Sequence, residues 1–272
     1  MSDMPVDFRG GWIPDLPDFF DSSEEEVAGL LVAKPPTILP PSVDLRKDFP
    51  PIRSQGELGS CSAFSVIALI EYLEEKLKNE VISASPLFLY YVTRRYEKRA
   101  GDSGATLRGT IKALRIFGCP PNEYYRYIIG KFEEEPGNFA YNFALSYKPI
   151  IYYRTDPKGR PTEEVLSKTK ETLSRGFPLS LGFTIFSNAL TDEVASTGNI
   201  PMPSTRDKIM GGHAITLAGY TDEHKKFIFR NSWGTGWGDK GYVTLPYDFV
   251  LKGLASDIWV ITSLEYESLG GK

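Results

Sequence analysis

Hydrophobic residues follow a helical period in the first half of the chain. Residues 61–77 carry apolar side chains on nearly every face of their first turns, which predicts a helix that begins inside the protein. Ser85 and Pro86 form an N-cap and first-turn pair that opens a second helix. A third helical pattern ends at Gly118, a residue type that often follows the last turn of a helix. These patterns predict a mainly helical lobe over residues 42–146.

The second half of the chain, residues 147–272, contains short runs rich in β-branched and aromatic residues. Six runs are predicted as strands, over residues 147–153, 178–183, 213–220, 226–232, 241–245 and 257–262. One helix interrupts them, opening at Thr162 and closing at Gly176. Helices first and strands second predict an α+β protein of two unlike lobes. The length of 272 residues fits this organisation, because it corresponds to roughly 1.8 domains.

Residues 1–41 differ from both lobes because they are acidic and contain seven prolines. One short helix is expected within residues 21–31, capped by Ser22 or Ser23. The segment is either an extended arm packed on the surface or a removable, regulatory pro-segment. Its candidate docking groups are Trp12, Ile13, Leu16, Phe19 and Phe20.

Composition and charge exclude several classes of function. Thirty-one basic against 35 acidic residues give a net charge of −4, and no basic run suggests binding to nucleic acid or to an anionic membrane. No stretch reaches the roughly 18 apolar residues of a membrane span. The N-terminus has no apolar region behind a basic start, so no signal peptide is predicted. A cytoplasmic location is the default expectation, with non-classical export left open.

The two cysteines and two histidines allow four Cys–His pairs. Cys61 lies at the start of the buried helix, where free N–H groups and the helix dipole stabilise a thiolate. Cys119 follows a helix end, where the carbonyls disfavour an anion, and is interpreted as a packing residue. His224 lies in a charged turn, whereas His213 opens an apolar strand after two glycines. The favoured pair is therefore Cys61 with His213.

A second polar group follows within thirty residues of the histidine. Asn231 ends an apolar strand, and its side chain can accept the imidazole N–H and fix the ring. The nearby Trp233 and Trp237 can shield that bond from water. A zinc site is not expected, because the Cys–Cys and His–His spacings of 58 and 11 residues lack the close pairs of structural zinc. No cofactor is predicted, and nothing singles out a carboxylate pair for hydrolysis.

These blocks resemble the papain-like cysteine proteases over residues 39–263. QGELGSCSAF is similar to the nucleophile segment of that family, GGHAITLAGY to its histidine strand and NSWGTGWGDKGY to its asparagine block. SPLFLYY and DSGATLRGTIKALRIFG resemble intermediate helices. The histidine and asparagine follow the cysteine by 152 and 170 residues, close to the family spacing of about 130 to 150.

The resemblance implies a fold and a set of roles. The fold would have a helical lobe and an antiparallel β-barrel-like lobe, with an extended peptide or protein substrate in the cleft between them. Cys61 would be the nucleophile, His213 the general base and later acid, and Asn231 the group that orients the imidazole. Gln55 would donate to the oxyanion together with the Cys61 backbone N–H. The reaction would form a thioester on sulfur and then hydrolyse it.

The resemblance also implies a substrate-binding surface. Gly104 and Ala105 would pair with the substrate backbone. The pocket for the second residue before the cut would be lined by Leu107, Gly182, Gly211 and Asp257, and Trp233 and Trp237 would also lie in the substrate site. Asp257 at the base of the pocket could attract a cationic side chain.

The sequence departs from many relatives at Leu58, Ser62 and Gly212, none of which removes a catalytic group. The usual disulfides cannot form, because Cys61 must stay free and Cys119 is then alone. GGWIPDLPD is similar to a short N-terminal block of bacterial relatives. The main hypothesis is an endopeptidase whose arm covers the cleft as in a zymogen. The alternatives are a catalytically silent peptide-binding protein, and an amidase, transferase or protein-conjugate hydrolase that uses the same dyad.

Overall fold

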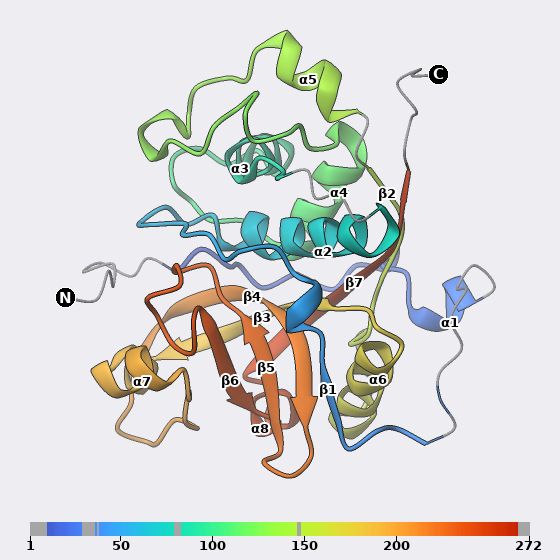
Figure 1. Ribbon diagram of the computed structural model, residues 1–272, viewed down its shortest axis with the longest axis vertical. Helices are drawn as coiled ribbons and strands as arrows, with labels where there is room; N and C mark the ends of the chain where they lie inside the picture. Colours follow the sequence, from blue (N-terminus) through green and yellow to red (C-terminus); the bar gives the residue numbers. More distant parts are fainter. Residues whose placement is uncertain (1–9, 29–35, 37, 79–82, 146–147, 266–272) are drawn as a thin grey trace.

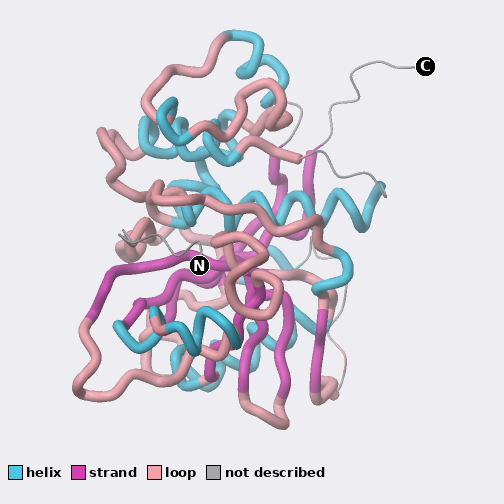
Figure 2. The backbone as a smooth tube through the Cα atoms, turned by 60° about the vertical axis from the view of Figure 1, so that its left-hand side comes forward, coloured by secondary structure: helices cyan, strands magenta, loops and turns pink. Residues whose placement is uncertain are grey.

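The protein has a helical lobe and a sheet lobe, as the sequence predicted. The computed structural model describes residues 10–28, 36, 38–78, 83–145 and 148–265. The helices within residues 61–144 gather on one side of the molecule and an antiparallel sheet lies on the other (Figure 1; Figure 2). Within the described ranges, no helix is long and apolar enough to cross a membrane.

The helical lobe is built around one buried helix. Its helices are α2 (Cys61–Lys78), α3 (Pro86–Tyr96), α4 (Leu107–Phe117) and α5 (Asn138–Ala144). The Ser85 hydroxyl caps α3 by accepting the Phe88 N–H at 3.1 Å, and the Thr106 hydroxyl caps α4 by accepting the Gly109 N–H at 2.8 Å. The helical pattern of the sequence therefore identified α2, α3 and α4, whereas α5 was not predicted.

Among the described residues the sheet lobe contains a seven-stranded sheet, with six strands in the order β2-β7-β3-β4-β5-β6 and β1 paired to β4. The strands are β1 (Ser42–Asp44), β2 (Lys148–Arg154), β3 (Leu179–Phe186), β4 (Ile209–Thr221), β5 (Lys226–Arg230), β6 (Tyr242–Pro246) and β7 (Ala255–Glu265). This order makes β2 and β6 the two ends of an open sheet rather than of a closed barrel. β1 corrects the boundary drawn from sequence, because it lies within residues 42–146 but belongs to the sheet.

The helices that lie between strands β2 and β7 along the chain are α6 (Thr162–Ser174), α7 (Asp192–Thr197) and α8 (Asp248–Leu251). Short 3₁₀ turns lie at Arg46–Asp48, Ile129–Lys131 and Ser187–Leu190. Of these, only α6 was predicted. The others are too short to show a hydrophobic period, so local turn chemistry rather than patterning determines them.

Helix α2 joins the two lobes through a buried polar contact as well as apolar packing. The Ser65 hydroxyl lies 2.7 Å from that of Ser180 on β3, and the Thr216 hydroxyl of β4 donates to the Ser65 carbonyl at 3.1 Å. Such buried bonds stabilise one relative position of the two elements, because sliding would leave polar atoms unsatisfied. The N-terminus of α2 is therefore held at a fixed place against the sheet.

The N-terminal arm passes between the lobes. From residue 10 it runs between α2 and the sheet to α1 (Glu24–Val27), on the far side of the molecule (Figure 1). Helix α1 follows Ser23, whose N–H donates to the Glu26 carboxylate at 2.8 Å. The predicted helix over residues 21–31 is thus reduced to one turn, and residues 29–31 lie outside the described range.

Gly118, the residue after α4, packs against the C-terminal end of α5, and a substitution at this position tests that contact. Its φ of 71° and ψ of −163° suit glycine alone, and a Cβ would lie 1.7 Å from the Ala144 carbonyl oxygen. We expect Gly118→Ala to lower the free energy of unfolding by about 3 kcal/mol, from backbone strain together with the clash. Gly101→Ala is the control, with a similar φ of 64° and no atom within 4 Å, and should cost about 1 kcal/mol. Equal losses in denaturant melts would contradict the contact with α5.

Candidate active site

Cys61 is the first residue of α2, and the turn before it is held by hydrogen bonds from the helical lobe. The Gly59 N–H donates to the Asp102 carboxylate at 3.0 Å, and the Tyr90 hydroxyl donates to the same carboxylate at 2.6 Å. Tyr127 donates to the Gln55 carbonyl at 2.7 Å. These contacts fix the position of the cysteine before any ligand arrives.

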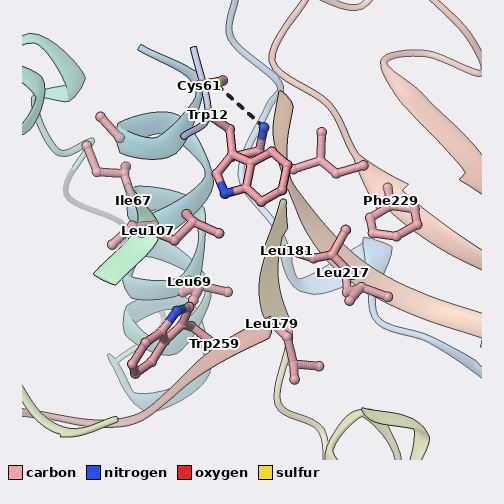
Figure 3. Close-up of a cluster of buried hydrophobic side chains, with 14 of the residues drawn as sticks. Trp12, Cys61, Ile67, Leu69, Leu107, Leu179, Leu181, Leu217, Phe229 and Trp259 are labelled. Carbon is pink, nitrogen blue, oxygen red and sulfur yellow. Dashed lines mark hydrogen bonds between the residues drawn. The ribbon is translucent and has the colours of Figure 1, made fainter. Parts of the chain in front are cut away.

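The Cys61 thiol is fully buried against strand β4. Its sulfur accepts the Ala214 N–H at 3.4 Å, and the N–H groups of Ser62 and Gly11 also face it (Figure 3). Burial raises the pKa of the thiol to about 11, although these N–H groups oppose the rise. In this state of the molecule the sulfur is therefore a neutral thiol.

His213 and Asn231 form a shielded pair beside the cysteine. The His213 Nε2 lies 2.8 Å from the Asn231 Oδ1, and the amide oxygen fixes that nitrogen as the donor. The Trp233 ring lies over the imidazole, with 4.8 Å between ring centroids. Burial lowers the pKa of His213 to about 4, so the imidazole is neutral here. His213 and Asn231 therefore form the contact that the sequence predicted, and Trp233 covers it.

Gln55 lies on the loop that leads to Cys61. Its Nε2 donates to the Leu58 carbonyl at 2.9 Å, and its Oε1 accepts the Ser232 hydroxyl at 2.5 Å. These contacts define which end of the amide carries the donors. The nitrogen carries two N–H groups, so one bond to Leu58 leaves a second donor on the same atom.

The arm occupies the surface that the sequence assigned to substrate. Ala105 donates its N–H to the Gly11 carbonyl at 2.9 Å and accepts the Ile13 N–H at 3.1 Å, while the Trp12 N–H donates to the Gly212 carbonyl at 3.2 Å. The arm is thus bonded to both lobes. It runs parallel to the segment that contains Ala105.

The Trp12 side chain fills a pocket next to Cys61 and is only 7% exposed. Its indole lies between α2 and β3 (Figure 3). A Cβ on Gly182 would lie 2.0 Å from the ring, and one on Gly212 would lie 2.7 Å from it. The absent side chains at these two glycines therefore form the space for the indole. Leu107, fully buried at the start of α4, belongs to the same apolar cluster.

Gly211 does not face this pocket, contrary to the assignment from sequence. Alternate residues of a strand share a face, so Gly212 and Ala214 lie on the side of Gly182, which pairs with Ala214. Gly211 is on the opposite face of β4, and Gly10 of the arm packs against the backbone of both Gly211 and Gly212. The correct pocket residue is its neighbour Gly212.

Asp257 lies at the base of the pocket and is 2% exposed. Its Oδ2 accepts the Trp12 indole N–H at 3.1 Å and the Asp15 N–H at 2.8 Å, and its Oδ1 accepts from Arg154 at 3.2 Å. Burial, with the nearby Asp15 carboxylate, raises the pKa of Asp257 to about 7. Arg154 is thus a cationic neighbour of Asp257, while Trp12 and Asp15 of the arm donate its other two hydrogen bonds.

Trp237 lines a separate hollow on the other side of Trp233. The two indoles meet edge to face, 4.6 Å apart, beside a pocket of about 320 Å³. Its lining comes from Ile52, Ser54, Trp233, Gly234, Thr235, Gly236 and Trp237. No arm residue within the described range 10–28 lines this hollow, which is therefore an open part of the candidate site.

Comparison with known proteins agrees with this geometry. The family model described as papain family cysteine protease matches residues 39–257. The chain belongs to the papain family of cysteine proteases. As a papain-family peptidase it is a hydrolase that acts on peptides or proteins.

Relatives of the papain family differ in how much of the arm they share. An uncharacterised peptidase C1-like protein of Acanthamoeba polyphaga mimivirus is 34% identical over 92% of this chain and 86% of its own length. The crystal structure of xylellain, a cysteine protease from Xylella fastidiosa, matches with 31% identity and a TM-score of 0.79, covering 96% of this chain and 98% of xylellain. Both matches cover a larger fraction of this chain than residues 39–272 make up, so each match includes part of the arm.

More distant members of the papain family match a smaller share of the chain. Mouse cathepsin K is 28% identical over 76% of this chain and 60% of its own length. The structure of a cysteine protease from Carica candamarcensis supports the fold alone, with 21% identity, a TM-score of 0.58, and coverage of 84% of this chain and all of that one.

The remaining candidates from sequence lie away from this papain-family site. Cys119 is buried and donates its thiol to the Ser85 carbonyl at 3.3 Å, while His224 is exposed in a turn. Among the described residues, no group of three or more His, Cys, Asp or Glu side chains is placed to hold a metal ion. Cys119 is thus a packing residue, as the sequence predicted.

Three residues that contribute to the site were not identified from sequence. Asp102 and Tyr90 hold the turn before Cys61, but a single acid and a single tyrosine in helical or polar surroundings give no local signal. Trp12 was named only as a docking group, without a place to dock. The sequence does contain a signal for it. A large apolar side chain within a glycine- and proline-rich segment needs a pocket, and glycines in another element can provide that space.

The position of Trp12 predicts how fast Cys61 reacts. Trp12→Ala should raise the rate at which iodoacetamide alkylates Cys61 near pH 6 by at least about 100-fold, because truncating a buried tryptophan costs about 3–5 kcal/mol. Phe19→Ala is the matched control, since this arm aromatic is 95% exposed and should change nothing. Mass spectrometry after digestion separates labelled Cys61 from Cys119, which should stay unreactive in both variants. Equal Cys61 rates in wild type and both variants would show that Trp12 does not restrict access.

Proposed function

We propose that the protein is a cysteine endopeptidase that acts through a thioester on Cys61. In the first step the sulfur attacks the scissile carbonyl carbon, and His213 receives the thiol proton. The oxyanion accepts hydrogen bonds from the Cys61 N–H and the Gln55 side chain. The C–N bond then breaks, and the imidazolium of His213 gives its proton to the departing amine.

The second step uses the same groups in reverse. Water attacks the thioester carbonyl while His213 accepts its proton, and the Cys61 thiolate leaves as the acid product forms. Asn231 keeps the imidazole in the tautomer and orientation that both steps need. The observation that carries this proposal is the 2.8 Å contact between His213 and Asn231 beneath Trp233, beside a cysteine at a helix N-terminus.

The arm is proposed to act as a built-in inhibitor, held in a direction that keeps its own backbone from being cut. A substrate with its second residue before the cut in the Trp12 pocket must run from that pocket toward Cys61. The arm runs the other way, with Gly11 at Cys61 and Trp12 following it into the pocket. The sulfur faces an amide N–H of Gly11 rather than an accessible carbonyl carbon, which supports a non-productive complex.

The covered site also has the wrong protonation states for reaction. Burial holds Cys61 as a thiol and His213 as a neutral imidazole, with pKa values of about 11 and about 4. Arm release returns water to the site, which lowers the pKa of the thiol and raises that of the imidazole. The two groups then favour the thiolate–imidazolium pair that attacks carbonyl carbon. The arm is therefore proposed to block the pocket and to suppress the nucleophile at once.

Arm release gives the first test of this proposal. A recognition sequence for a site-specific protease, inserted between Ala28 and Ile38, allows the arm to be cut after the protein has folded. Cutting should raise kcat/KM for unstructured peptides by at least tenfold, and Cys61→Ala should abolish the activity. Asn231→Ala should lower kcat by roughly 10–100-fold and leave KM almost unchanged. Activity that survives Cys61→Ala would refute the mechanism, and activity unaltered by cutting would refute inhibition by the arm.

The pocket gives a second test, of substrate preference. Once the arm leaves, the Asp257 Oδ2 loses its bonds to Trp12 and Asp15, so a substrate donor can replace them. We expect peptides with Arg in the second position before the cut to be accepted alongside those with Leu. Asp257→Asn should lower the Arg-to-Leu ratio of kcat/KM about tenfold, since a hydrogen bond to a charged group is worth about 1.5–3 kcal/mol. The ratio cancels differences in arm release, and an unchanged ratio would contradict this role of Asp257.

A further inference from the structure

Two basic side chains on α4 are paired with carboxylates of the arm. The Arg108 Nε donates to the Asp21 carboxylate at 2.6 Å, and its guanidinium also approaches Asp15 and Asp18 at 4.0 Å. The Lys112 Nζ lies 3.1 Å from the Asp18 carboxylate. Within the described residues, the acidic groups that contact these two cations all belong to the arm.

Arg108 and Lys112 lie on one face of the helix because they are four residues apart. Arg154 of β2 also contacts Asp21, at 2.9 Å, but it keeps Asp156 and Asp257 as partners within the sheet lobe. Departure of the arm therefore affects the cations unequally. Arg154 stays compensated, whereas Arg108 and Lys112 lose the carboxylates that now neutralise them.

The vacated cations lie on the path of a substrate. The arm extends from Cys61 through the Trp12 pocket to Asp15, whose N–H bonds to Asp257 at the pocket base. A substrate of opposite direction places the residues that precede its pocket residue along this same path. With Trp12 at the second position, Asp15 and Asp18 of the arm stand at the fifth and eighth positions, and these carboxylates approach Arg108 and Lys112. The two cations thus face the fifth to eighth residues before the cut.

We propose that Arg108 and Lys112 form a subsite that selects acidic side chains at the fifth to eighth positions before the cut. This inference rests on the proposed peptidase function and on the direction of the substrate argued above. The arm imitates the acidic side chains of such a substrate while its backbone runs in reverse. The same pair of cations then serves both states, holding the inhibitor and afterwards recognising substrate.

Cleavage of matched peptides by the arm-cut enzyme tests the subsite. The peptides share residues at the cut and in the pocket, and carry Glu, Gln or Lys at the fifth to eighth positions. The Glu-to-Gln ratio of kcat/KM should be about tenfold at low salt, as expected for two partly exposed ion pairs. It should fall toward one at about 1 M salt, where the Debye length is about 3 Å. The Lys peptides should be poorer than the Gln peptides.

Variants assign the preference to the two residues. The double variant R108Q/K112Q should bring the Glu-to-Gln ratio close to one. Arg115→Gln is the control on the same helix, because Arg115 is exposed and packs on Tyr152 instead. A Glu-to-Gln ratio near one in the wild-type enzyme, or one that the double variant leaves unchanged, would overturn the proposal.

A separate readout distinguishes failure of the subsite from failure of the proposed function. Fluorescence anisotropy measures binding of labelled Glu and Gln peptides to the arm-cut Cys61→Ala protein, which needs no catalysis. Tighter, salt-sensitive binding of the Glu peptide would support the subsite even if no peptide were hydrolysed. Equal affinities together with normal hydrolysis would reject the subsite and leave the peptidase standing.

Discussion

The buried indole of Trp12 is the contact on which the closed state of this molecule depends. It joins three parts of the chain at once: the arm that carries it, the glycines of β3 and β4 that make room for it, and Asp257 that accepts its N–H. Full burial of an aromatic side chain contributes several kcal/mol. That contribution is enough to hold a segment otherwise rich in proline and acidic residues across the boundary between the lobes.

Charge gives the arm a second means of attachment, distributed along its length. Beyond Trp12, its acidic residues meet basic partners on both lobes: Asp18 with Lys112, Asp21 with Arg108 and Arg154, Glu24 with Lys168 and Arg175, and Glu25 with Arg160. The pairs of Asp18 and Glu25 are partly exposed and individually weak, whereas those of Asp21 and Glu24 are largely buried. Together the pairs align the arm along both lobes, and salt screens the contribution of the exposed ones.

The sequence predicted much of the fold because its longest elements carry clear periods. Helices α2, α3 and α4 have helical spacing with Ser or Thr at the start or Gly at the end, and the β-rich runs appear as strands in the sheet. It could not place β1 in the sheet, because three residues are too short to show alternation. Likewise, α5, α7 and α8 have few turns, and their positions follow from tertiary packing.

The candidate site was predicted unevenly for a similar reason. Cys61 and His213 stand out because a helix start and a glycine-flanked strand give each a distinct environment. Gly211 was chosen over Gly212 because the face of a glycine pair is decided by strand register, which the sequence does not reveal. The role of Trp12 depends on a contact over 245 residues to Asp257, beyond any local pattern.

The central claim is that the arm and a substrate-like ligand cannot occupy the site together. The indole N–H signal of Trp12 in a nitrogen-edited NMR spectrum, identified by its loss in Trp12→Phe, reports directly on the docked arm. In the full-length protein this proton should exchange slowly with solvent, because it is buried against Asp257. Alkylation of Cys61 by a peptidyl chloromethyl ketone with Phe in its second position should move the signal to that of a solvent-exposed indole. A Trp12 signal that stays protected while Cys61 is fully modified would contradict the account.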